Sequence, residues 1–148
     1  MALVFNGTTN VISGVAVGGL PDGIVDTDIL AANAVNETKL ATNQQQGLAK
    51  AWVNFNGTGT LAVRDSFNVS SVTDNGTGNY TINFTSAFPN ANYVVTGTSG
   101  GQGSTSNGAV YQYDQGTAKT TSACNIITIT TSGGFADAPQ VAVAFFGD

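Results

Sequence analysis

Histidine is absent from this 148-residue sequence, and cysteine occurs once, as Cys124. Without histidine the chain lacks the commonest general base, the commonest zinc ligand and an essential member of Ser-His-Asp or Cys-His catalytic sites. One cysteine forms neither an internal disulfide nor a thiolate metal site within one chain. We therefore expect no cofactor and no metal ligand, and we expect Cys124 to be a small buried residue beside Ile126.

Charge is also scarce, since only 9% of the residues are charged, against roughly a quarter in a typical domain. The four basic residues lie far apart along a chain of net charge −5: Lys39, Lys50, Arg64 and Lys119. Nucleic-acid binding requires clustered basic residues, so we exclude this partner. Hydrophobic residues nevertheless make up 41% of the chain, which predicts a folded protein.

Long apolar runs are missing as well. The most apolar stretch near the start, residues 11–20, contains Ser13 and several glycines, and it is about half the length of a membrane span. Residues 1–6 include no basic residue and no sustained apolar run, so we expect neither membrane insertion nor a signal peptide.

Residues 1–23 alternate short apolar groups with turn residues such as Asn6-Gly7, which predicts a small hairpin followed by extended chain. This segment is too short and too rich in glycine to bury a core alone. We expect its apolar side chains to anchor the chain on another protein; alternatively, they pair with copies of themselves at the base of a stalk. The anchor candidates are Leu3, Val4, Phe5, Val11 and Ile12.

Residues 24–47 contain a degenerate ten-residue repeat, in which residues 25–33 align with residues 35–43. Several parallel chains around an axis would bury the repeated apolar rows, as in a short oligomeric stalk. The alternative is one or two ordinary amphipathic turns with Thr or Asp caps. Residues 44–47, Gln-Gln-Gln-Gly, are expected to form a polar joint.

Residues 48–148 have the alternation typical of β-strands, which is clearest where Tyr80, Ile82 and Phe84 alternate with polar residues. A hairpin turn is expected at residues 74–78 and a glycine-rich loop at residues 97–108. These patterns predict an all-β domain, an antiparallel β-sandwich of the jelly-roll type. The expected strands include residues 52–56, 66–70, 79–85, 93–96, 109–113, 125–130 and 141–145.

No residue of the sequence is a clear candidate for catalysis. Glycoside hydrolysis needs only two carboxylates, but Glu37 is the sole glutamate and strands and turns separate the aspartates of residues 48–148. The glycine-rich stretch at 97–104 lacks the lysine of a phosphate loop. We therefore predict a protein that is not an enzyme, with a two-carboxylate glycan depolymerase as the open alternative.

Aromatic residues indicate a binding function. Tyr111 and Tyr113 share one face of an expected strand, where tyrosine rings can stack on sugars while neighbouring amides bind hydroxyls. With the loop residues Gln102 and Asn107, they are our candidate receptor contacts. The alternative places both tyrosines in the core or in a subunit interface.

Three strings carry a family resemblance: Lys-Ala-Trp-Val-Asn-Phe-Asn-Gly at 50–57, Arg-Asp-Ser-Phe-Asn-Val-Ser-Ser at 64–71, and Pro-Asn-Ala-Asn-Tyr at 89–93. Together with residues 30–35, they resemble the stalk and C-terminal domain of bacteriophage tail fibres and related virion fibres, particularly those of marine and cyanobacterial phages. The resemblance implies a homotrimer on the virion surface, bound through its N-terminus to a tail or capsid protein, with a distal domain that attaches to a host glycan or protein.

The chain is very short for a tail fibre. A capsid-surface decoration fibre or a tail adaptor without a receptor function therefore fits its length equally well. A third alternative, from another class, is a monomeric carbohydrate-binding module.

Overall fold

The computed structural model describes residues 4–6, 11–13, 35–36, 39–101, 109–112 and 119–147. The chain divides into two compact units, Met1–Ala41 and Thr42–Asp148. In the first, β1 (Val4–Asn6) pairs antiparallel with β2 (Val11–Ser13), which confirms the expected hairpin. Leu3 and the side chains of the other four anchor candidates lie outside the described residues, as does most of the repeat at 25–43.

The second unit begins with a single helical turn, α1 (Thr42–Gln46), which includes residues 44–46 of the expected polar joint. Glutamine is a good helix former, and no proline or glycine interrupts the turn. The helix ends at Gln46, and the amide of the following Gly47 donates to the Gln44 carbonyl at 3.2 Å.

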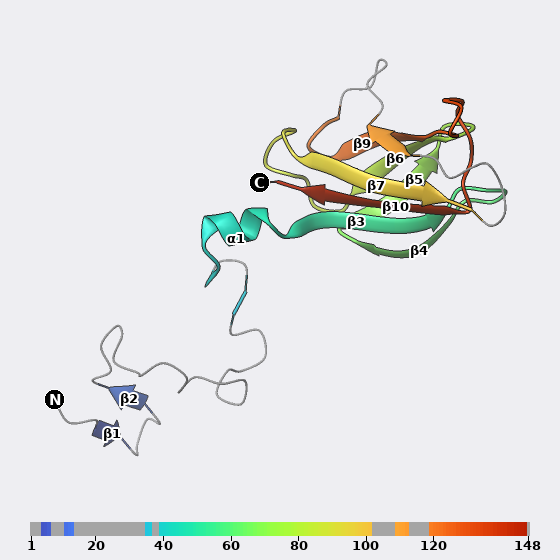
Figure 1. Cartoon of the computed structure of the whole chain (residues 1–148). Helices are drawn as coiled ribbons and strands as arrows, with labels where there is room; N and C mark the ends of the chain where they lie inside the picture. The colour runs from blue at the N-terminus through green and yellow to red at the C-terminus, as the bar shows by residue number, and fades with distance from the viewer. Residues whose placement is uncertain are drawn as a thin grey trace. The chain divides into compact units, whose positions relative to one another are not determined.

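Eight strands follow in the described part of this unit, and they form two four-stranded antiparallel sheets. The first sheet, in the order β4-β3-β10-β7, consists of β4 (Ala62–Phe67), β3 (Ala49–Asn56), β10 (Gln140–Phe146) and β7 (Val94–Gly100). The second, in the order β5-β6-β9-β8, consists of β5 (Val69–Asp74), β6 (Asn79–Phe84), β9 (Ala123–Thr128) and β8 (Val110–Gln112). Figure 1 shows the two sheets packed as layers of a sandwich, so the predicted fold class is confirmed.

Alternate residues of the central strands fill the space between the sheets. Phe55 of β3 packs edge-to-face on Tyr80 of β6, with ring centroids 5.0 Å apart. Phe145 of β10 meets Phe84 of β6 in the same manner, also at 5.0 Å. Cys124 of β9 is fully buried in this core, as the sequence predicted.

One expected strand, residues 66–70, is divided between the two sheets. Asn68 has a left-handed backbone (φ 54°) and lies between the end of β4 and the start of β5. Its side chain stabilises this conformation, because Nδ2 donates to the carbonyls of Lys50 and Ser86 and Oδ1 accepts from the Ser86 amide. Asparagine tolerates this conformation better than most residues, so the apparent alternation conceals a crossing between sheets.

Part of the expected glycine-rich loop is also strand, because β7 continues through residues 97–100. A Cβ atom on Gly97 would lie 2.7 Å from the Ala142 carbonyl oxygen and 3.2 Å from Val110 Cβ. Gly97 therefore permits a close approach between neighbouring strands, and the pattern was misinterpreted as a loop signal.

Candidate functional site

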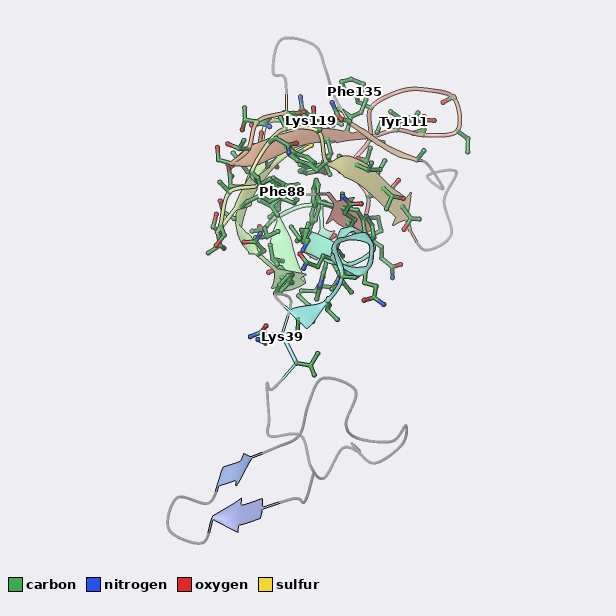
Figure 2. All side chains as sticks on the ribbon, turned by 90° about the vertical axis from the view of Figure 1, so that its left-hand side faces the viewer. Lys39, Phe88, Tyr111, Lys119 and Phe135 are labelled. Carbon is green, nitrogen blue, oxygen red and sulfur yellow. The ribbon has the colours of Figure 1, made fainter. Side chains whose placement is uncertain are left out.

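Tyr111 is the one predicted receptor contact within the described residues. It lies on β8 in register with Ile127, and 51% of its surface is exposed. Phe135, which the sequence analysis did not select, is 46% exposed and forms a β-bridge with Ile129, two residues beyond Ile127 on the chain. Figure 2 shows Tyr111 and Phe135 near the same end of the β-sandwich unit. Tyr113, Gln102 and Asn107 lie outside the described residues, so their grouping with Tyr111 stays a prediction.

The outer face of the β5-β6-β9-β8 sheet is rich in Asn, Ser and Thr, but the side chains of these residues largely bind one another. Asn83 Nδ2 donates to Ser71 Oγ at 3.0 Å and to Thr73 Oγ1 at 3.1 Å. Thr81 Oγ1 accepts from the amides of Asn75 and Asn125. Much of the hydrogen-bonding capacity of this face is therefore used within the protein.

The outer face of the first sheet differs, because it contains a groove of about 390 Å³. Two parallel rows of side chains cross three strands there: Trp52, Ala144 and Thr96 in one row, and Asn54, Ala142 and Thr98 in the other. The alanines of the central strand β10 leave a hollow between the larger side chains of β3 and those of β7. Strand spacing makes each row roughly 10 Å long, with about 7 Å between the rows.

The groove combines an apolar surface with polar groups that have no partner among the residues that the structure describes. Its apolar part is the partly exposed Trp52 side chain and the two alanines. Among the described residues, the Asn54 amide nitrogen and the hydroxyls of Thr96 and Thr98 have no hydrogen-bond partner. All nine lining residues are uncharged. The arrangement suits a ligand with both a nonpolar face and hydroxyl groups.

Arg64 fixes the orientation of the Asn54 side chain. One guanidinium nitrogen donates to Asn54 Oδ1 at 3.1 Å, and another donates to the Pro139 carbonyl at 2.5 Å. Because Oδ1 accepts from Arg64, the Nδ2 group of Asn54 remains available as a donor. Arg64 is an extra residue in β4, opposite the register shift between Asn54 and Phe55, and the resulting bulge accounts for its position beside Asn54.

The side chains whose pKa is shifted lie in the core, away from this groove. Burial raises the pKa of the phenols of Tyr80 and Tyr93 well above the usual range, and it raises the pKa of Cys124 to about 11. In the described part of the chain, no three His, Cys, Asp or Glu residues are grouped so that they could hold a metal ion. Over the same residues, no helix has the length and hydrophobicity needed to cross a membrane.

The groove was not predicted from the sequence, although the strand that includes Trp52 was. The signal was the alternation of Trp52, Asn54 and Asn56 with buried residues, which puts a large aromatic residue and two amides on the solvent side of β3. Comparison of the chain with protein-family models, with curated proteins and with solved structures gave no match.

Proposed function

We propose that this chain is a homotrimeric virion fibre protein, bound to a phage particle through its N-terminal unit, whose β-sandwich attaches the particle to a host surface. One observation carries the proposal: the outer faces of the sandwich present uncharged amides, hydroxyls and partly exposed aromatic rings. The side chains whose pKa is shifted are buried in the core. Such a surface suits binding without catalysis. The resemblance of residues 50–57, 64–71 and 89–93 to virion fibres adds support.

Attachment can be tested with fluorescently labelled full-length protein on a panel of marine and cyanobacterial strains. We expect saturable binding to some strains and none to others, because a receptor-binding domain discriminates between surfaces. Incubation with the purified surface polysaccharide of a bound strain should leave its chain length unchanged. Absence of binding to every strain would favour a decoration fibre or an adaptor, whereas shortened polysaccharide would favour the depolymerase.

The oligomeric part of the proposal is tested by native mass measurement of the full-length chain. At micromolar concentration we expect the mass of a homotrimer. The reason is that the repeat at 25–43 would bury its apolar rows only between chains. A folded, stable monomer would contradict the trimer and favour the carbohydrate-binding module.

The anchoring function of the first unit is tested by deletion of residues 1–20. Left exposed, their apolar side chains would form an aggregation-prone patch, whereas burial against a larger shell would stabilise binding at about 25 cal/mol per Å². We expect the shortened chain to keep its oligomeric state but to be absent from assembled particles. Normal incorporation into particles would show that residues 1–20 are not the anchor.

A further inference from the structure

We propose that the groove on the outer face of the β4-β3-β10-β7 sheet is a binding site for a neutral saccharide, with Trp52 as the stacking surface and Asn54, Thr96 and Thr98 as the groups that bind sugar hydroxyls. The inference rests on the proposed attachment function and deepens it, because it names the ligand class and the site. It also moves the expected sugar contact from Tyr111 to the opposite sheet.

The shape of the groove fits a small ligand unit. Ala142 and Ala144 on the central strand leave space between Trp52 on one side and Thr96 and Thr98 on the other. The volume, about 390 Å³, lies at the lower end of the range of roughly 300–1,000 Å³ found for small-molecule sites. A site of this size takes one or two sugar rings of a longer glycan.

The chemistry of the groove favours a sugar over another apolar surface. Pyranose rings combine a nonpolar C–H face, which stacks on indole, with hydroxyls that both donate and accept hydrogen bonds. The Asn54 amide nitrogen is a donor whose orientation Arg64 fixes, and the two threonine hydroxyls are donors and acceptors. A dry protein interface over these groups would leave them unpaired, which is unfavourable.

The absence of charge in the lining favours a neutral sugar over an acidic one. None of the nine lining residues is ionisable, and Arg64 at the margin already donates to Asn54 and to the Pro139 carbonyl. The chain as a whole carries a net charge of −5, which repels polyanions.

The competing occupant is a second copy of this chain. Phe67, which is in register with Trp52, is 50% exposed, and Val94, in register with Phe146, is 62% exposed. These residues extend the apolar surface of the same face beside the groove. The test therefore measures the oligomeric state together with sugar binding.

Trp52 makes the site directly observable, because it is the only tryptophan in the chain. The full-length protein is titrated with soluble neutral oligosaccharides derived from dextran, mannan and galactan, and with oligogalacturonate as the acidic comparison. We expect a saturable change in tryptophan emission with at least one neutral oligosaccharide and none with the acidic one. If no neutral oligosaccharide changes the emission, or if only the acidic one does, the proposal is wrong.

Two variants and two matched controls locate the binding on the sheet. Asn54→Asp keeps the acceptor for Arg64 but removes the donor, and Ala144→Leu fills the hollow. Asn90→Asp adds the same charge in a loop where Oδ1 still accepts from the Asn92 amide, and Ala62→Leu adds the same side chain on an exposed position of β4. We expect at least a tenfold loss of affinity for Asn54→Asp and Ala144→Leu and less than a twofold change for the controls, since a site built on hydrogen bonds discriminates strongly against a lost partner.

The outcomes separate the site from the attachment function. Unchanged sugar binding by Asn54→Asp and Ala144→Leu overturns the proposal, and so does a changed native mass in Ala144→Leu, which would identify a subunit interface. If wild-type protein and Asn54→Asp attach equally well to cells, the attachment function stands and the groove is not the receptor site. If wild-type protein attaches to no strain but the emission titration succeeds, the groove binds sugar and the attachment function fails.

Discussion

The Tyr80 hydroxyl donates a hydrogen bond of 2.9 Å to Asp137 Oδ1, and the same oxygen accepts the Gly78 amide at 2.7 Å. Tyr80 is fully buried on β6, whereas Asp137 lies on the connection that leads into β10. The contact therefore links the two sheets through the segment that precedes β10. It also contributes to the raised pKa of Tyr80, in which burial is the larger cause.

Removal of this acceptor should destabilise the sandwich. Asp137→Ala leaves the Gly78 amide without its partner and leaves Tyr80 only the longer bond to the Gly57 carbonyl at 3.2 Å. We expect the free energy of unfolding to fall by about 1–3 kcal/mol in urea denaturation. Asp137→Asn keeps an oxygen acceptor and should lose less. Equal losses for the two variants would show that the carboxylate charge matters more than the hydrogen bonds.

Gly57 should not tolerate a methyl group, because an added Cβ would lie 2.9 Å from Tyr80 Cζ and against its hydroxyl oxygen. We expect Gly57→Ala to destabilise the protein by about 1–3 kcal/mol, since Tyr80 is held in a packed core. The loss should be smaller in a Tyr80→Phe background, which removes the closest atom. Gly134→Ala is the control, because its nearest neighbour would be 3.7 Å away. Additive losses in the double variant would contradict the proposed clash.

Asn68 combines a strained backbone with three side-chain hydrogen bonds, and two substitutions separate these contributions. Asn68→Gly relieves the left-handed conformation but removes the bonds to Lys50 and Ser86. Asn68→Ala removes the bonds and keeps the strain, which costs about 1–2 kcal/mol for an ordinary residue. We therefore expect both variants to be less stable than wild type in thermal denaturation, with Asn68→Ala the less stable of the two. The reverse order would show that the backbone conformation carries little strain.

The buried thiol predicts a loss of stability at alkaline pH. Burial raises the pKa of Cys124 from 9.0 to about 11, so the folded protein keeps a proton that the unfolded chain loses across this window. The contribution to stability is complete below pH 9.0 and falls as pH rises toward 11. In urea denaturation between these pH values, Cys124→Ala should weaken the pH dependence by up to about 1.4 kcal/mol per pH unit. Tyr80 contributes the same pH dependence to both proteins, whereas the pKa of Tyr93 should rise less in Cys124→Ala, because burial is its main cause and the Cys124 thiol adds to it. Identical slopes for the two proteins would contradict the prediction.

Local patterns in the sequence determined the β-sandwich and much of its strand content. Alternation with a period of two predicted which side of β6 faces the core, because successive strand residues point to opposite faces whatever the partner strand. The turn at residues 74–78 was likewise predictable, since its glycines occupy left-handed positions, with φ of 118° at Gly76 and 62° at Gly78. The single cysteine and the absence of histidine limited, from the sequence alone, the kinds of catalytic and metal-binding site that could be expected.

Only the tertiary structure decided where the polar and aromatic side chains meet. Trp52, Ala144 and Thr96 come from three distant segments, and they share a row because the registers of β3, β10 and β7 place them opposite one another. Strand register depends on long-range pairing, which no single segment encodes. The same limit explains Gly97, whose role is set by its distance from Ala142 and Val110 on other strands. Composition and the exposed aromatic residues led only to the hypothesis of a sugar-binding surface, whereas the pairing of strands selects the face on which a groove exists.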